Sequence, residues 1–135
     1  MICYDTSFML DLLGRGGRRS QEAAAAKLEQ LEDHGGGATT RFNIAELQVG
    51  IELAANRESE RAAIEYALSG IRILEFDAAS AEMYAHLYAR LRRTGTMPGI
   101  LDLLIAAVAV VNSHDILTRN VRHFSRISEL VVHTY

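Results

Sequence analysis

The sequence has 135 residues, of which 49% are hydrophobic and 23% are charged. This balance excludes a disordered chain and predicts a globular protein whose core forms without disulfides. The net charge of −3 argues against binding nucleic acid through overall positive charge. Any such binding must therefore come from local clusters of arginine, since Lys27 is the only lysine.

The first part of the chain alternates short apolar runs with polar breaks. Residues 1–5 are predicted as a strand and residues 7–13 as a short helix with apolar side chains at helical spacing. Glycines and arginines at 14–19 predict an exposed basic loop. A second helix is predicted over 20–33, with Ser20 as its N-cap.

The middle of the chain repeats this alternation. A short strand is predicted at 38–40, followed by a helix that begins at Asn43. The apolar face of that helix is predicted to comprise Ile44, Leu47, Ile51 and Leu53. A helix at 57–68 and a strand at 71–76 follow, and Asp77 stands where the next helix needs an N-cap.

The last part begins where that helix ends, near Arg93. A linker at 94–99 contains the only proline, and an apolar helix begins near Ile100. A buried strand is predicted at 115–118 and a short last strand at 130–133. Alternating strands and helices favour a parallel sheet covered on both faces, so we expect one domain of 135 residues with an α/β fold, a three-layer α/β/α sandwich with a central, mainly parallel sheet.

Oxygen-bearing side chains stand where strands end or the following helices begin. Asp5 closes the first strand, Glu46 lies early in the helix after the second, Asp102 opens the apolar helix, and Asn120 follows the strand ending at Thr118. Ligands of open parallel sheets collect at this edge. Neighbouring carboxylates need a cation to offset their repulsion, and oxygen ligands select Mg²⁺ or Mn²⁺. This predicts a metal-dependent phosphodiester hydrolase.

Each of these acids also has an ordinary structural explanation. The segment from Asn43 to Glu46 is a possible capping box, Asp102 is favoured near a helix N-terminus by the helix dipole, and Asp5 could cap the first helix. Helix caps alone do not require all the acids to lie at one edge of the sheet. The functional interpretation rests on this joint placement.

Local sequences along nearly the whole chain resemble one family. The segments DTSFMLDLL at 5–13, AELxxG at 45–50, DLLIAA at 102–107 and TRNVRxF at 118–124 together look like the signature blocks of VapC-type PIN-domain toxins. Any one block is a weak signal, whereas four blocks in this order and at these intervals are fairly specific.

The resemblance implies the role of each residue and the cofactor. Asp5, Glu46 and Asp102 would hold Mg²⁺ or Mn²⁺, and Asn120 stands where the family has aspartate or asparagine. The supporting residues would be Thr6 and Thr118. The chain would be an endoribonuclease, and Arg119 and Arg122 are candidates for binding phosphates of the RNA substrate, with a solvated surface role as the alternative.

The resemblance also implies partners. Members of the family are usually homodimers that a cognate antitoxin protein holds inactive, and operator DNA would be reached only through that antitoxin. The expected compartment is the cytoplasm, because Cys3 is the only cysteine, the N-terminus lacks a signal peptide, and the apolar run at 103–111 is too short for the ~18 residues of a membrane span.

Departures from the family pattern leave a second function open. Ile100 and Leu101 stand where relatives often carry polar or acidic residues, and His123 stands where an acid is common. The alternative is therefore a catalytically weak or inactive PIN domain that acts as a protein-binding module. A signalling receiver with Asp77 as phosphoacceptor is disfavoured, because the late lysine that receivers need is missing.

Other candidate residues receive structural interpretations. Asp11 is interpreted as a solvent-facing helix acid, with a supporting role at the site as the alternative. Cys3 is predicted to be a small core residue and not a nucleophile. Tyr84 and Tyr88 are expected in the core or, by preference, at a dimer interface.

Overall fold

A computed structural model describes residues 1–32 and 35–135. Its sheet has five strands in the order β3-β2-β1-β4-β5, and every neighbouring pair is parallel. The strands are β1 (Ile2–Tyr4), β2 (Ala38–Thr40), β3 (Arg72–Leu74), β4 (Asp115–Leu117) and β5 (Val132–His133). The helices are α1 (Thr6–Leu12), α2 (Arg18–Leu31), α3 (Arg41–Leu53), α4 (Arg57–Leu68), α5 (Ala78–Thr94), α6 (Ile100–Val111) and α7 (Val121–Phe124).

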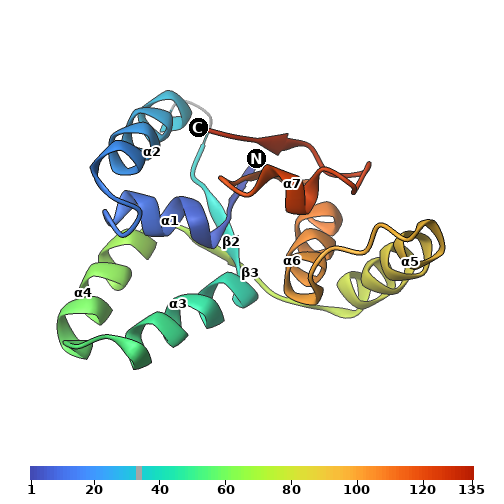
Figure 1. Cartoon of the computed structure of the whole chain (residues 1–135), viewed down its shortest axis with the longest axis horizontal. Helices are drawn as coiled ribbons and strands as arrows, with labels where there is room; N and C mark the ends of the chain where they lie inside the picture. The colour runs from blue at the N-terminus through green and yellow to red at the C-terminus, as the bar shows by residue number, and fades with distance from the viewer. Residues whose placement is uncertain (33–34) are drawn as a thin grey trace.

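The helices cover the two faces of the sheet in two groups. Figure 1 shows α1 to α4 on one side of the strands and α5 to α7 on the other. Successive residues of a strand point to opposite faces, and the burial follows this rule: Cys3 and Ile116 join the α5–α7 core, whereas Tyr4 and Leu117 join the α1–α4 core. The predicted three-layer α/β/α sandwich is confirmed.

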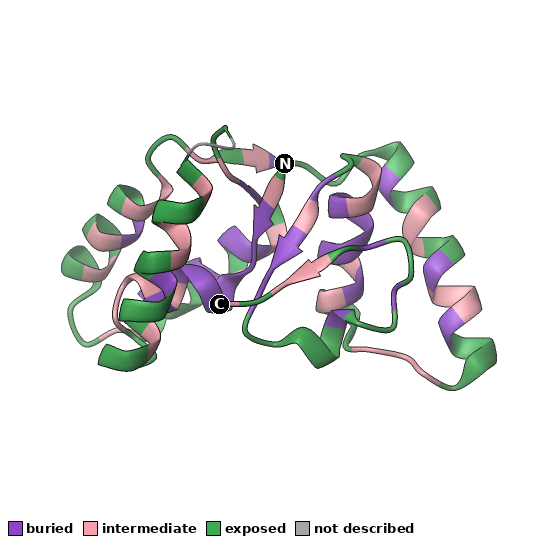
Figure 2. Ribbon diagram, turned by 90° about the horizontal axis from the view of Figure 1, so that it is seen from above, coloured by how far each residue is buried: buried purple, intermediate pink, exposed green. Residues whose placement is uncertain are grey.

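Burial is concentrated in the three central strands, β1, β2 and β4, and in the inner faces of the helices (Figure 2). Helix α6 is the most apolar element, with six buried residues, because it packs between the sheet and α5. Within the described residues, no helix combines the length and the apolar character needed to cross a bilayer.

Several boundaries differ from the sequence predictions. Helix α2 begins at Arg18 after Gly17, not at Ser20, and its predicted end at Asp33 lies outside the described residues. Helix α3 begins at Arg41, because Thr40 and not Asn43 is its N-cap. Leu53 was predicted on the apolar face of α3 but is 82% exposed, since it is the last residue of the helix.

The C-terminal part holds a further difference. The short helix α7 was not predicted, and the strands predicted at 71–76 and 130–133 are shorter in the structure. Asp77 caps α5 as predicted, because its side chain accepts a hydrogen bond of 2.9 Å from the Ser80 amide. Asp77 therefore has a structural role at the start of α5.

Candidate active site at the carboxyl edge of the sheet

The parallel pairing of β1 and β4 brings the first acid next to the chain's late segment. Tyr4 pairs with Leu117, so the next residues, Asp5 and Thr118, lie side by side at the edge. A cavity of about 220 Å³ opens there. It is lined by Asp5, Thr6, Ser7, Leu10, Glu46, Asp102, Arg119 and Asn120. All four residues predicted to bind the metal thus face one cavity, which we call the acidic cavity.

Hydrogen bonds fix the Asp5 carboxylate. One of its oxygens, Oδ2, accepts from the Thr118 hydroxyl at 2.7 Å and from the Ser7 hydroxyl at 3.0 Å, and the other, Oδ1, accepts from the Asn43 amide at 3.1 Å. Asp5 is only 5% exposed, so few orientations remain open to it. Although Asp5 is the N-cap residue of α1, its side chain makes no capping hydrogen bond, which leaves the carboxylate to the cavity.

Glu46 faces Asp5 across the cavity from the second turn of α3. The Thr6 hydroxyl donates a hydrogen bond to its carboxylate. Burial raises the pKa of Glu46, the Thr6 hydrogen bond opposes that rise, and the charges of Asp5 and Asp102 add to it. The acids therefore interact electrostatically, and a cation among them would relieve the cost of keeping all three ionised.

Asp102 enters the cavity from the first turn of α6. Its side chain is 26% exposed, and its Oδ2 lies 3.0 Å from Nδ1 of His123. Burial raises the pKa of Asp102, the neighbouring His123 lowers it, and the charge of Asp5 raises it. His123, noted in the sequence only as a departure, is thus a direct partner of a candidate metal ligand.

The donor set fits a hard divalent cation in its chemistry. Three carboxylates and the amide of Asn120 supply only oxygen ligands, as Mg²⁺ and Mn²⁺ prefer. Within residues 1–32 and 35–135, no three acidic, histidine or cysteine side chains lie close enough together to hold an ion as they stand. The carboxylates of Asp5, Glu46 and Asp102 would therefore have to move closer together to share one ion.

Asn43 contributes to the site in a way that the sequence analysis missed. It was interpreted as a helix N-cap, but its Nδ2 group donates to Asp5 Oδ1 at 3.1 Å and to the Thr6 hydroxyl at 3.0 Å. It can do so because it is the third residue of α3, where its Oδ1 also accepts from Thr40. The threonine three residues before Asn43 was the available signal.

Asp11 also differs from its interpretation as a solvent-facing acid. It is fully buried and accepts hydrogen bonds from Arg119 Nη1 at 2.8 and 2.9 Å and from the Tyr135 hydroxyl at 2.6 Å. Gly16 packs so closely that a Cβ there would lie 1.9 Å from Asp11 Oδ1. The alternative, a supporting role near the site, matches this placement, because Asp11 holds an arginine that lines the acidic cavity.

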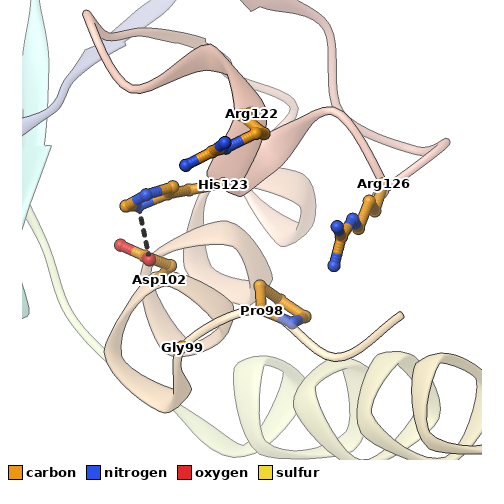
Figure 3. Close-up of a pocket in the computed structure, with 6 residues that line it drawn as sticks. All are labelled: Pro98, Gly99, Asp102, Arg122, His123 and Arg126. Atoms are coloured by element: carbon orange, nitrogen blue, oxygen red, sulfur yellow. Dashed lines mark ion pairs between the residues drawn. The ribbon is translucent and has the colours of Figure 1, made fainter. Parts of the chain in front are cut away.

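The candidate substrate-binding arginines lie at two different places. The Arg119 side chain is half exposed at the mouth of the acidic cavity. Arg122 instead lines a neighbouring hollow together with His123 and Asp102 (Figure 3). The neighbouring Asn120 is exposed, and its backbone amide donates to Thr118 Oγ1 at 3.0 Å, which ties the Asn120 segment to the end of β4.

Residues outside the site have structural roles. Cys3 is fully buried, and burial raises the pKa of its thiol to about 12, as expected for a core residue and not for a nucleophile. Tyr84 and Tyr88 pack partly buried against the α5–α7 core, with ring centroids 5.9 Å apart. Their predicted place at a dimer interface stays a prediction.

Comparisons with known proteins agree with this architecture. The PIN domain matches residues 2–130. Ribonuclease VapC1 of Rickettsia felis is 32% identical over 98% of this chain and 95% of its own length, and ribonuclease VapC19 of Mycobacterium tuberculosis is 34% identical over 96% and 97%. The crystal structure of VapBC2 from Rickettsia felis, bound to a DNA fragment from its promoter, aligns with a TM-score of 0.88 at 26% identity over 99% of this chain and 98% of that chain.

Proposed function

Because this chain belongs to the PIN-domain family, we propose that it is a metal-dependent endoribonuclease of the VapC type, the toxin of a toxin–antitoxin pair. The relatives named above are ribonucleases. The observation that carries the proposal is the shared cavity of Asp5, Glu46, Asp102 and Asn120, which come from distant parts of the sequence. Such a gathering of oxygen ligands is what phosphodiester hydrolysis with a divalent cation requires.

In the proposed mechanism, each side chain has a defined task. Asp5 and Asp102 would bind Mg²⁺ or Mn²⁺ directly, Glu46 would bind the ion or orient a water, and Asn120 would contribute a neutral oxygen. The bound ion would supply a water of lowered pKa and Lewis-acid stabilisation of the charge at phosphorus. In-line attack of a water on phosphorus, with cleavage of the bond from phosphorus to the 3′ oxygen and transfer of a proton to that oxygen, would leave a 5′-phosphate and a 3′-hydroxyl.

Neighbouring residues set the geometry of this reaction. Thr118 and Ser7 hold one oxygen of Asp5, and Thr6 holds Glu46. Arg119 would contact a phosphate of the RNA through the guanidinium nitrogens that Asp11 does not engage, since only Nη1 is bonded to Asp11.

The proposal includes a protein partner. The similar VapBC2 structure was determined with promoter DNA. We propose that this chain forms a homodimer, binds a cognate antitoxin and reaches operator DNA only through it. Coexpression with a candidate antitoxin, followed by light scattering and a gel-shift assay on promoter DNA, tests this. A shift by the isolated chain alone would contradict it.

A cleavage assay tests the catalytic proposal. Total RNA is incubated with the protein in Mn²⁺ or in EDTA, and we expect fragments only with the metal. Asp5→Asn and Asp102→Asn should lower the rate at least about 100-fold, because each removes a charged ligand. Asp115→Asn is the matched control, since Asp115 begins β4 at the opposite end of the sheet and pairs with His133.

The possible outcomes separate the two functions left open by the sequence. Equal cleavage by the wild type and Asp5→Asn would contradict the proposal and indicate a contaminating nuclease. Antitoxin binding without any metal-dependent cleavage would favour the protein-binding module. The half-exposed Ile100, at the start of α6, is the feature that keeps this alternative open.

Thermal unfolding tests the metal site without any substrate. Mn²⁺ at about 100 times its dissociation constant should stabilise the wild type by about 2.7 kcal/mol, because it binds only the folded chain. Asp5→Asn should lose most of this shift. Glu46→Gln should not lower the melting temperature in EDTA, because it removes a half-buried charge that repels Asp5 and Asp102. If Mn²⁺ stabilised the wild type, Asp5→Asn and Glu46→Gln equally, the acidic cavity would be ruled out as the metal site.

A further inference from the structure

A second hollow adjoins the acidic cavity. It has a volume of about 390 Å³ and is lined by Pro98, Gly99, Asp102, Arg122, His123 and Arg126. Figure 3 shows Arg122 and His123 reaching from α7 toward Asp102, while Arg126 points toward the linker at Pro98. Asp102 belongs to the walls of both spaces, so whatever fills this basic hollow lies directly beside the candidate catalytic acids.

The charge of the basic hollow is not neutralised by the protein. Within the part of the chain that the structure describes, neither Arg122 nor Arg126 forms an ion pair, in contrast to Arg119, which is paired with Asp11. The one carboxylate in the hollow is Asp102, and it is in contact with His123. Two guanidinium groups therefore face this space without a carboxylate of their own.

The arginine nearest the linker makes one hydrogen bond to it. Arg126 Nη1 donates a hydrogen bond of 3.3 Å to the carbonyl oxygen of Thr96, in the linker that precedes α6. This contact uses one nitrogen of a planar group with five N–H donors. The remaining donors are available to an anion, and the guanidinium fork matches the oxygens of a phosphate.

We propose that the basic hollow binds the RNA phosphate and nucleotide next to the scissile one, with Arg122 and Arg126 as the phosphate-binding residues. The inference rests on the proposed function, since it takes the scissile phosphate to lie in the acidic cavity. The shared wall at Asp102 favours RNA over an acidic peptide, because an RNA strand with its scissile phosphate in the acidic cavity can place the next nucleotide in the adjoining hollow. The volume falls in the range of small-ligand sites.

The test measures how RNA binding depends on salt, in EDTA so that no cleavage occurs. A labelled single-stranded RNA of about 12 nucleotides and mixed sequence serves as the probe, a length within the usual site sizes. For a single strand, the slope of log affinity against log salt becomes shallower by about 0.7 for each phosphate that the protein no longer neutralises. We expect a shallower slope in Arg122→Gln and in Arg126→Gln, and a change of about 0.7 in the double variant, in which the one phosphate of the hollow is no longer neutralised.

Arg19→Gln is the matched control, because Arg19 is exposed on α2 on the other side of the sheet. It should leave the slope unchanged. In cleavage assays, Arg126→Gln should raise KM several-fold with little effect on kcat, as expected for a group that binds the substrate away from the reacting atoms.

The outcomes distinguish this inference from the proposed function. Unchanged slopes in both variants, or no measurable RNA binding by the wild type, would overturn it even if Asp5→Asn abolishes cleavage. Reduced slopes with no cleavage by the wild type would support the hollow and contradict the nuclease. If the variants weaken binding of a poly-glutamate peptide but leave the RNA slope unchanged, the hollow is an acidic-peptide site and the inference is wrong.

Discussion

Asp11 illustrates how one buried charge supports the site from outside it. Its carboxylate has no exposed surface and accepts from Arg119 and Tyr135. Burial is the main cause that raises the pKa of the Tyr135 hydroxyl, and the hydrogen bond to Asp11 raises it further. A buried carboxylate needs such donors, because unpaired charge in the interior is costly.

Replacing this residue should affect both stability and substrate binding. Asp11→Asn keeps the shape but removes the charge that holds Arg119, and we expect a loss of about 1–3 kcal/mol in the free energy of unfolding. Urea denaturation should show a lower midpoint with an unchanged slope. KM for RNA should rise, because Arg119 is no longer held at the cavity.

The control for Asp11→Asn is an exposed pair. Glu22→Gln removes the partner of Arg18 on α2, where both side chains are mostly exposed, and should change stability by less than about 0.5 kcal/mol. Equal losses of unfolding free energy in Asp11→Asn and Glu22→Gln would show that the buried contact with Arg119 stabilises the fold no more than an exposed ion pair does.

At the residue scale, the sequence could locate the acids but not their neighbours. Asp5, Glu46 and Asp102 stand out because each follows a strand or opens a helix. The burial of Asp11 depends on Arg119, which is 108 positions away in the chain. No local sequence pattern predicts a contact between residues so far apart in the chain. Asp11, a helix acid next to a glycine-rich loop, was therefore interpreted as exposed.

At the scale of elements, the start of α3 links helix formation to the site. Thr40 ends β2 and caps α3, and Asn43 completes the capping box while donating to Asp5. The orientation of Asp5 therefore depends on the same hydrogen bonds that begin the helix.

Removing this cap should cost stability and activity together. Thr40→Val keeps the volume but loses the hydroxyl. We expect a loss of about 1–2 kcal/mol together with slower cleavage, because the Asn43 side chain loses one of the hydrogen bonds that orient it beside Asp5. Asn56→Ala removes the exposed cap of α4, where Asn56 accepts from Ser59 at 3.0 Å. It should cost similar stability in a thermal melt, yet leave the cleavage rate unchanged; a parallel fall in rate would argue that stability alone limits activity.

Most elements were predictable, because their apolar spacing is local information. The exceptions depend on packing. The helix α7 is only four residues long and is held by burying Phe124, which no periodic pattern can show in so short a segment. The capping residue of α3 was misplaced because both Thr40 and Asn43 are good N-caps, and only the course of β2 decides between them.

At the scale of the whole molecule, a histidine connects separate parts of the sheet's amino edge. His114 precedes β4, and its Nδ1 lies 2.6 Å from the carbonyl oxygen of Asn112, so this nitrogen carries the proton. Its Nε2 then accepts a hydrogen bond of 2.9 Å from Arg72 at the start of β3. Burial is the main cause that lowers the pKa of His114; Arg72 and the N-terminal amine add to it, while Asn112 and Asp115 oppose it.

The global stability should therefore fall on acidification. The unfolded chain takes up a proton near the ordinary histidine pKa of about 6.5, whereas the folded chain resists it, so the contribution of His114 is present at neutral pH and is lost as the pH falls below that value. We expect the free energy of unfolding in urea to fall more between pH 7.5 and 5.5, by up to about 1 kcal/mol, in the wild type than in His114→Gln. Glu46 and Asp102 titrate in both proteins, so an equal fall in both would contradict this role of His114.

The order of the strands and the positions of the two cavities could not be predicted from the sequence. Alternating strands and helices predicted a parallel sheet, but the order β3-β2-β1-β4-β5 is set by which helices pack on which face. The basic hollow depends on α7 folding back over the start of α6, so neither Arg126 nor the linker carbonyl that it contacts could be predicted.

Asp102 lines both the acidic cavity and the basic hollow, and this affects how inhibitors and variants should be designed. A small molecule that joins a metal-chelating head to an anionic arm would fill both spaces across this one carboxylate, and its potency would depend on Arg122 and Arg126 as well as on the metal. For the same reason, an Asp102 variant perturbs two subsites at once, whereas Asp5 reports on only one.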